Sequence, residues 1–297
     1  MLQSAMEYLM TYGWAILIIA VVLGALFGLG FFNSANLAPK VSAGSCRVYR
    51  PQGPGTTSFV NLEGTCNNEL PQYVAQFKNG YMTTPIPSSA SLSQGTVIMW
   101  IKKSWTNNPN SGQYGILGLG GSYGVTGDSY GDSNALEIFK YGGDNNWYFR
   151  MGSSACSITV PDTSFLNYSW YQVAMEWGGS PYGEKVWIDG GSPNVCTGGS
   201  PSTVWALPTW FIGKGYQNSV FYGYLANLQV YNSSLTANEV TALYDEGIGG
   251  VPIDLSRLVG WWPLNGNAND YSGNLNNVNY TSGVNFTGSW ASGYTAP

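Results

Sequence analysis

The chain of 297 residues contains no histidine, and this absence excludes several kinds of chemistry. Without an imidazole, neither a Ser-His pair nor a Cys-His pair can activate a nucleophile. The cysteines offer no alternative metal site, because no C-x-x-C spacing occurs among them. The sequence therefore predicts neither a zinc protein nor a hydrolase that depends on histidine.

Charge is also scarce. Only 9% of the residues are charged, and 11 Lys and Arg against 16 Asp and Glu give a net charge of −5. The chain has no basic surface to neutralise phosphates, so we expect no nucleic-acid partner. Glycine (40), tyrosine (21) and tryptophan (12) are abundant instead. This is not the composition of an ordinary cytosolic protein.

No lysine or arginine precedes the apolar run Trp14–Phe32, which is 19 residues long. A secretory signal has a basic start and a small-residue cleavage site, whereas Asn33-Ser-Ala-Asn36 is a poor site. At about 1.5 Å per helical residue, the run can just cross a hydrocarbon core of about 30 Å. We therefore expect residues 1–38 to form a retained hydrophobic helix that serves in assembly or as a transmembrane anchor.

Glu7 is the only charged residue before Lys40, and it lies at the amino edge of the apolar run. An unpaired carboxylate is costly to desolvate, so a bundle of such helices would place it against an amine or hydroxyl of a neighbour. Gly24 and Gly28 form a G-x-x-x-G pair that allows close helix approach. The alternative is a one-pass anchor in which Glu7 lies among lipid headgroups.

The stretch from Gln3 to Ile19, QSAMEYLMTYGWAILII, resembles the processed amino terminus of archaeal type IV pilin-like proteins, which carry a class III signal peptide. The resemblance implies that Glu7, the fifth residue from Gln3, pairs with a neighbouring subunit's terminal amine. It implies a subunit that is inserted in the cytoplasmic membrane and then polymerises with copies of itself into an extracellular helical filament. The residues that it assigns to filament assembly are Gln3, Glu7, Tyr8, Tyr12, Trp14, Gly24 and Gly28.

The chain departs from that pattern at its start, Met1-Leu2, which has no basic leader and no glycine before Gln3. We expect either that the sequence is already processed or that the cleavage site is displaced.

Four cysteines and four N-x-S/T sequons are features of an exported chain. Oxidising conditions favour disulfides, and among three possible connectivities the nearest pairs in sequence are Cys46–Cys66 and Cys156–Cys196. Candidate glycosylation sites are Asn167, Asn232, Asn279 and Asn285.

After Phe32 the pattern becomes that of short strands. A neck rich in Pro, Gly and Ser covers Ser34–Ser58. The predicted strands are Thr96–Trp100, Ala135–Tyr141, Asn146–Met151, Trp170–Trp177, Lys185–Asp189, Trp210–Ile212 and Gly223–Tyr231. Thr236 and Glu239 form a capping box, which predicts a short helix. We expect a neck and first head segment over residues 39–71 and an antiparallel β-sandwich head over residues 72–297.

The head resembles the laminin-G-like, concanavalin A-like jelly-roll family over most of Gln72 to Gly283. The resemblance lies in Phe77–Met82, Thr96–Ile101, Trp170–Trp177, Lys185–Gly190 and Gly223–Tyr244. Leu258–Asn274 resembles the segment that normally opens this fold, which implies that residues 258–297 are a permuted opening segment. The alternatives are a truncated second repeat or a strand donated to another subunit.

Binding is a better expectation for the head than catalysis. Glycosidases on this kind of sandwich use two carboxylates about 5 to 9.5 Å apart, and no compact acidic strand motif supplies them, so we predict no catalytic residue. Exposed aromatic rings stack on sugars, and the candidates in or beside loops are Tyr123, Tyr130, Tyr141, Trp147 and Tyr216. Asp270, Asn274 and Asn276 are candidate ligands for calcium, with turn stabilisation as the alternative.

The sequence thus predicts a structural subunit of a type IV pilus-like filament that displays a lectin-like head for adhesion to glycans or surfaces. The alternative is a membrane-anchored monomeric lectin or adhesin, and a glycoside hydrolase comes last.

Overall fold

The computed structural model describes residues 12, 15–24, 46–53, 56–62, 71–90, 93–105, 112–119, 136–151, 157–178, 183–196, 209–295 and 297. For residues 46–53 and 56–62, and for Met151 and Tyr216, only the backbone is described.

The prediction of a long hydrophobic helix over residues 1–38 is wrong. The helix described in this part of the chain runs over residues 15–24, and no helix among the described residues is both long and apolar enough to cross a membrane. Hydropathy shows how apolar a segment is but does not set how far it stays helical. Four glycines between positions 13 and 30, Gly13, Gly24, Gly28 and Gly30, each disfavour a helix interior by about 1 kcal/mol.

The side chains of this described helix are exposed on every face. Ile16, Leu17, Ile18, Ile19, Val21, Val22 and Leu23 are 44% to 66% exposed. Of the residues assigned to filament assembly, Tyr12 and Gly24 are described, and Tyr12 is also exposed. Gln3, Glu7, Tyr8, Trp14 and Gly28 lie outside the described residues.

Part of the predicted neck is β-structure. Strands β1 (Cys46–Gly53) and β2 (Thr56–Leu62) pair in a two-stranded sheet of their own.

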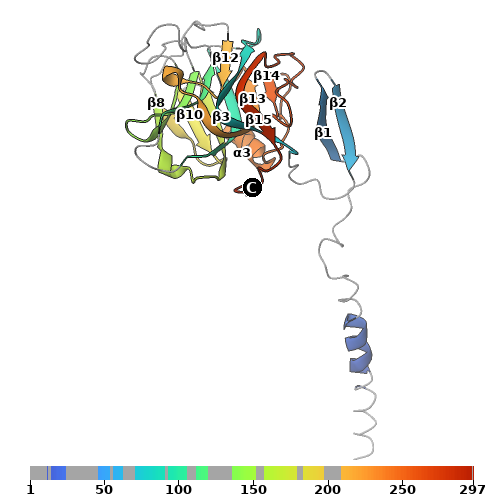
Figure 1. Ribbon diagram of the computed structural model, residues 1–297. Coiled ribbons are helices and arrows are strands. Elements are labelled where there is room, and N and C mark those ends of the chain that lie inside the picture. The colour runs from blue at the N-terminus through green and yellow to red at the C-terminus, as the bar shows by residue number, and fades with distance from the viewer. Residues whose placement is uncertain are drawn as a thin grey trace, which may run out of the picture. The chain divides into compact units, whose positions relative to one another are not determined.

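The expected all-β head is confirmed. A 13-stranded antiparallel sheet orders its main strands β11-β10-β9-β4-β13-β3-β12-β5-β6-β7-β8 (Figure 1). The strands are β3 (Val74–Pro85), β4 (Gly95–Lys103), β5 (Tyr114–Leu119), β6 (Leu136–Lys140), β7 (Asn146–Met151), β8 (Ser157–Pro161), β9 (Trp170–Trp177), β10 (Glu184–Ile188), β11 (Asn194–Cys196), β12 (Thr209–Ile212), β13 (Phe221–Tyr231), β14 (Leu258–Trp262) and β15 (Tyr280–Thr287). All seven predicted strands are present, two with the predicted bounds.

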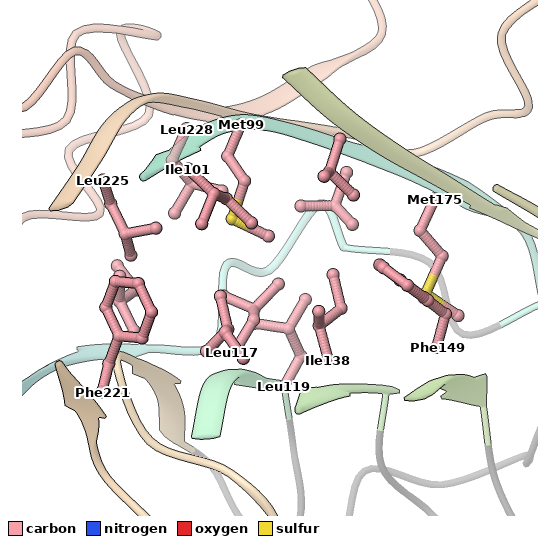
Figure 2. Close-up of a cluster of buried hydrophobic side chains, with 14 of the residues drawn as sticks. Met99, Ile101, Leu117, Leu119, Ile138, Phe149, Met175, Phe221, Leu225 and Leu228 are labelled. Carbon is pink, nitrogen blue, oxygen red and sulfur yellow. The ribbon is translucent and has the colours of Figure 1, made fainter. Parts of the chain in front are cut away.

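The sheet folds over on itself into a sandwich of two layers. The ends of the strand order, β11 and β8, lie in contact with each other. Figure 2 shows the core between the layers, where Met99 of β4 and Met175 of β9 face Ile138 of β6 and Phe149 of β7. We call the layer of β11, β10, β9, β4 and β13 the first layer, and that of β12, β5, β6, β7 and β8 the second layer.

The central strands of the first layer, β9, β4 and β13, are buried on both faces along most of their length. Along β4, Val97, Met99 and Ile101 point into the sandwich, whereas Ile98 and Trp100 point outward and are also buried. Helix α3 (Ala237–Asp245) and the C-terminal segment cover this outward side. The central run of β4, Val97–Ile101, is apolar at every position, as parallel-sheet strands usually are, although its neighbours here run antiparallel.

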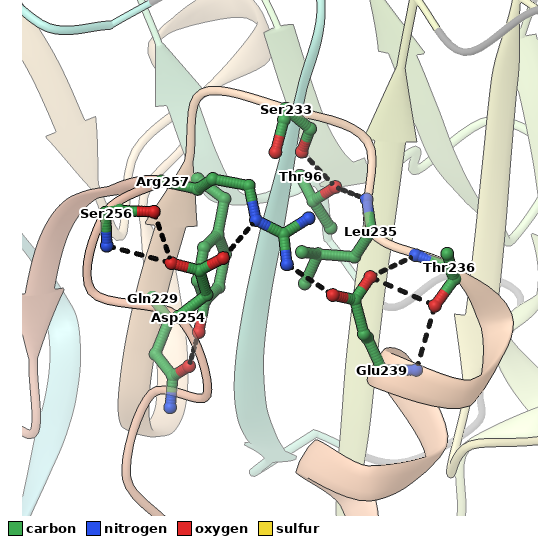
Figure 3. A network of polar contacts seen from close by, with 10 residues as sticks. Thr96, Gln229, Ser233, Leu235, Thr236, Glu239, Asp254, Ser256 and Arg257 are labelled. Carbon is green, nitrogen blue, oxygen red and sulfur yellow. Dashed lines mark hydrogen bonds and ion pairs between the residues drawn. The ribbon is translucent and has the colours of Figure 1, made fainter.

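Helix α3 begins with the predicted capping box. Thr236 Oγ1 accepts the Glu239 backbone N–H, and the Glu239 carboxylate accepts the Thr236 N–H. Figure 3 shows that Arg257, just before β14, also bonds to Glu239 and donates from Nε to Asp254 Oδ2 at 2.6 Å. The cap of the helix is therefore tied to the segment that leads into β14.

The C-terminal segment 258–297 joins the same sheet. Strand β14 pairs with the second half of β13, and β15 pairs along β3. The first and last strands of the head, β3 and β15, are therefore neighbours, and the segment is placed within its own chain's sheet. The circular permutation itself is not tested by this pairing.

Strand β3 passes from one layer to the other. Its first half, up to Gly80, pairs with β13 of the first layer, and its second half, from Met82, pairs with β12 of the second. Asn79 has a φ of 52° at this corner, and Gly283 on the neighbouring β15 has a φ of 64°. A Cβ on Gly80 would lie 2.4 Å from the carbonyl oxygens of Ser282 and Gly283, so the two backbones meet where only glycine fits.

The Gly80→Ala substitution should destabilise the head by about 1 to 3 kcal/mol, because the added methyl group forces β3 and β15 apart. Urea unfolding measures the effect. The matched control is Gly142→Ala, whose new Cβ would find its nearest atom, the Gln113 nitrogen, at an ordinary 3.6 Å. Equal stability of the two variants would contradict the proposed role of the corner.

Asp189 lies in the turn between β10 and β11, beside helix α3. Its Oδ1 accepts the Gln172 backbone N–H at 2.7 Å, and its φ of 50° is one that Asn and Asp tolerate. Burial raises the pKa of Asp189 to about 6, while the bond from Gln172 acts in the opposite direction. The carboxyl of Asp189 therefore binds a proton more tightly in the folded chain than in the unfolded chain. Above about pH 6 the carboxyl is ionised in both states, and its charge lowers the stability of the folded head.

The Asp189→Asn substitution keeps the acceptor oxygen and the tolerated φ but removes the charge. At about pH 7.5 it should stabilise the head by about 1 to 2 kcal/mol, a figure reduced for the partial exposure of the side chain. The gain should shrink as the pH falls through 6 towards 4, where the wild-type carboxyl is protonated in the folded state. Urea unfolding of both proteins across this range measures it, and a gain that does not change with pH would contradict the assignment.

Candidate functional site

The outer face of the second layer carries one continuous row of cross-strand pairs. Register places Tyr280 of β15 opposite Thr83 of β3, and Thr83 opposite Phe211 of β12. The row continues through Gly118 of β5 and Glu137 of β6 to Arg150 of β7. Directly paired residues share a face, so six strands contribute to this one surface.

One end of this row is an accessible aromatic surface, which we call the platform. It consists of Tyr81, Phe211 and Tyr280, with Tyr81 and Phe211 half-buried and Tyr280 50% exposed. The ring centroid of Tyr81 lies 5.5 Å from that of Tyr280 and 6.1 Å from that of Phe211. Three strands thus bring three rings together on a face that solvent reaches.

Polar groups border the platform. Lys214 lies in the segment between β12 and β13, and its Nζ is 4.9 Å from the Tyr81 ring centroid and 5.1 Å from that of Phe211. Burial lowers the pKa of Lys214, an effect that nearby Tyr280 opposes. Burial also raises the pKa of Tyr81, and its hydrogen bond with the Tyr280 side chain adds to this rise. An ammonium group therefore lies over two rings of the platform, which also carries two phenol groups.

The other end of the row is buried, although it faces away from the sandwich core. Arg150 Nε donates to Glu137 Oε2 at 2.6 Å, and the guanidinium lies over the ring of Phe139. Phe139 stacks on Tyr148, whose hydroxyl donates to Asp144. Burial and this bond raise the pKa of Tyr148 to about 12. These groups satisfy one another, so the platform is the part of the face that can meet a ligand.

The aromatic residues predicted from the sequence do not form the platform. Trp147 is buried, and its indole N–H donates to Asp162 Oδ1 at 2.7 Å. Asp162 also accepts from Trp105 and forms an ion pair with Lys103, so Trp147 stabilises a buried polar cluster and cannot reach a ligand. It shares the core face with Phe149, two positions along the same strand.

Tyr141 is half-buried and lies against Tyr148, away from the platform. Tyr123 and Tyr130 lie outside the described residues, as does the side chain of Tyr216.

The platform residues were missed for a definite reason. Tyr81 alternates with the buried Met82, and Phe211 lies between the buried Trp210 and Ile212. This alternation is a signal of outward-facing rings, and it could have identified each ring separately. The three rings come together only because strands roughly 60 to 200 positions apart in the chain pair with one another. Local sequence patterns do not specify such pairings.

The three candidate calcium ligands stabilise a turn. Asp270 is 1% exposed, and its carboxylate accepts the backbone N–H groups of Trp261, Ser272 and Asn276 at 2.8 to 2.9 Å. The side-chain amide of Asn274 donates to the carbonyl oxygens of Leu258 and Val259, and that of Asn276 donates to Val259. Among the described residues, no group of three or more acidic, cysteine or histidine side chains could hold a metal ion. The turn alternative accounts for these contacts.

Two of the three acids on the strands of the sheet have ion-pair partners. Glu137 pairs with Arg150, and Glu176 accepts from Lys185 Nζ at 3.0 and 3.2 Å. Both carboxylates are almost fully buried. Each is therefore held as part of an ion pair.

Cys196 is disulfide-bonded. It ends β11, which contacts β8, and β8 begins one residue after Cys156. Cys66 and Cys156 lie outside the described residues, as does the side chain of Cys46, so the two pairings stay predictions.

The sequons differ in exposure. Asn279 and Asn285 are exposed, before and within β15, whereas Asn167 and Asn232 are half-buried. Their glycosylation stays a prediction.

Three solved structures of low sequence identity align with parts of the chain. One from Bacteroides ovatus, named as carbohydrate-binding, aligns at a TM-score of 0.52 and 15% identity, over 78% of this chain and 64% of its own. A heptameric SAP-like pentraxin of Limulus polyphemus aligns at a TM-score of 0.42 and 18% sequence identity. The alignment covers 59% of this chain and 83% of the pentraxin chain. The CBM40 of the Ruminococcus gnavus IT-sialidase, solved with α2,3-sialyllactose, aligns at a TM-score of 0.41 and 13% sequence identity. The alignment covers 58% of this chain and 96% of the CBM40 chain.

The chain thus spans less than two thirds of the Bacteroides ovatus protein, and the likeness to that protein shows the fold alone. No curated protein matches the chain in sequence. The resemblance to type IV pilins stays a prediction.

A family model matches residues 77–241, from β3 into helix α3, and thereby confirms the jelly-roll resemblance. This stretch is more than half of the chain and contains two of the three strands that carry the platform. The protein belongs to the concanavalin A-like lectin/glucanases superfamily.

Proposed function

We propose that the head binds carbohydrate on the platform of Tyr81, Phe211 and Tyr280. The observation that carries the proposal is the meeting of three accessible rings with an ammonium group and two phenol hydroxyls. A pyranose has an apolar C–H face that packs on aromatic rings, and a rim of hydroxyls that bonds to polar groups. The platform offers both kinds of contact within one surface.

The proposal is binding without catalysis. Hydrolysis of a glycoside requires two carboxylates free to exchange protons across a cleft. Glu137 and Glu176, one acid on a strand of each layer, are instead buried in ion pairs with Arg150 and Lys185. The Bacteroides ovatus protein of the same fold is named as carbohydrate-binding, which agrees with this proposal.

The Tyr280→Ala and Phe211→Ala substitutions should each weaken glycan binding about 3- to 10-fold, because a stacked ring contributes about 0.5 to 1.5 kcal/mol. A glycan array identifies the ligand, and calorimetry then measures the dissociation constants. Tyr222→Ala is the matched control, because this tyrosine is 39% exposed on β13 and lies outside the platform.

Array binding that is unchanged in both platform variants would contradict the site. An array on which the wild-type chain binds no glycan would contradict the function.

We also propose that the chain is a subunit of an extracellular filament of the type IV pilus kind, assembled through its apolar N-terminal segment. The support is the sequence from Gln3 to Ile19 and the helix over residues 15–24, whose apolar side chains are exposed on all faces. Exposed apolar surface of this kind marks an interaction with protein or lipid. In the filament, Glu7 would find its partner on a neighbouring copy.

The Glu7→Gln substitution should abolish filaments, because an amide cannot make the ion pair that orders neighbouring subunits. Electron microscopy of surface appendages measures filament yield, and cell fractionation checks that the subunit still reaches the membrane. Asp245→Asn is the matched control, since it makes the same kind of change at an exposed position of helix α3. Normal filaments from Glu7→Gln would contradict the proposal and favour a monomeric membrane-anchored lectin.

A further inference from the structure

Lys214 differs in what its charge contacts from the other lysines of the sandwich that are buried or half-buried. Lys103 and Lys185 form ion pairs with Asp162 and Glu176. Lys102 donates to two backbone carbonyl oxygens, and Lys140 donates to one. In the part of the chain that the structure describes, Lys214 Nζ instead lies over the rings of Tyr81 and Phe211 and has no carboxylate partner.

The chain as a whole makes such a cation unusual. Acidic residues exceed basic ones by 16 to 11, so carboxylates are more numerous than the cations that could pair with them. The two rings hold the ammonium by a cation–π contact worth about 0.5 to 1 kcal/mol at an accessible site. A carboxylate arriving from outside would offer a full opposite charge and a charge-assisted hydrogen bond, which is a stronger contact.

The groups around Lys214 suit an anion. The ring centroids of Tyr81 and Tyr280 lie 5.5 Å apart, and Lys214 Nζ lies 4.9 Å from the Tyr81 centroid. A phenol hydroxyl and an ammonium group can both donate to an oxygen anion. Lys214 Nζ lies 4.9 and 5.1 Å from the centroids of two platform rings, so a ligand that contacts the platform could place an acidic group beside this ammonium.

We propose that the platform selects acidic sugars, with the sugar carboxylate bound by Lys214 and the adjoining tyrosine hydroxyls. The inference rests on the proposed carbohydrate-binding function and names its ligand class, which includes uronates and sialates. Neutral sugars of the same shape bind more weakly, because they offer the Lys214 ammonium no opposite charge.

The test compares each acidic oligosaccharide with its own methyl ester, which keeps the sugar and removes the charge. Calorimetry on the full chain in detergent uses oligogalacturonate, oligoglucuronate and sialyllactose, each with its ester. The acid forms should bind at least about 10-fold more tightly than the esters, a difference of about 1.4 kcal/mol. Added salt should weaken only the acid forms appreciably, since the contact lies at an accessible surface.

The Lys214→Met variant keeps most of the side-chain stem over the rings and removes the charge, so acid and ester should then bind alike. Lys78→Met is the matched control, because Lys78 is exposed on β3 outside the platform, and this variant should keep the preference. Folding of both variants is checked by urea unfolding.

Equal binding of acid and ester by the wild-type chain would overturn the acidic-sugar inference and leave the carbohydrate-binding function standing. Binding of neutral glycans only, with no acidic glycan bound, would do the same. The absence of binding to any glycan would overturn both.

Discussion

The passage of β3 between the two layers is the constraint on which the rest of the head depends. Its first half closes the first layer against β13, and its second half opens the second layer against β12. The turn in the strand requires Gly80, because the backbone of β15 lies where a side chain would be. Tyr81 follows at once, so the same corner that joins the layers also directs the first ring of the platform outward.

Several of the chain's few charged residues are buried inside the head. Lys103 and Asp162 pair within the aromatic cluster of Trp105 and Trp147, and Lys102 fixes the C-terminal segment through the Trp290 carbonyl. Charged groups are tolerated in a protein interior only when they are ion-paired or hydrogen-bonded. Each such contact restricts how the strands can be arranged. Lys214 differs from these residues, because its described contacts are to aromatic rings. In a chain with so little charge, this lysine indicates where a charged ligand could bind.

Local pattern was sufficient to predict seven strands of the head and its helix. It predicted β7 with its observed bounds, and the Thr236 capping box predicted the start of α3. The same reasoning overstated the N-terminal helix, since apolarity was taken as a measure of helix length. It also placed Trp147 in a ligand site, because an aromatic residue beside a loop has the same sequence pattern whether it faces solvent or core.

The sequence by itself determined the absence of histidine chemistry, the all-β class, the jelly-roll family and the elements of the head, because these depend on composition and on contacts between near neighbours. Tertiary structure alone decided which rings meet, since Tyr81, Phe211 and Tyr280 share a face only through the register of β3 with β12 and β15. It also decided that Lys214 lies beside them. Register depends on the packing of the entire sandwich, and no short window of sequence contains that information.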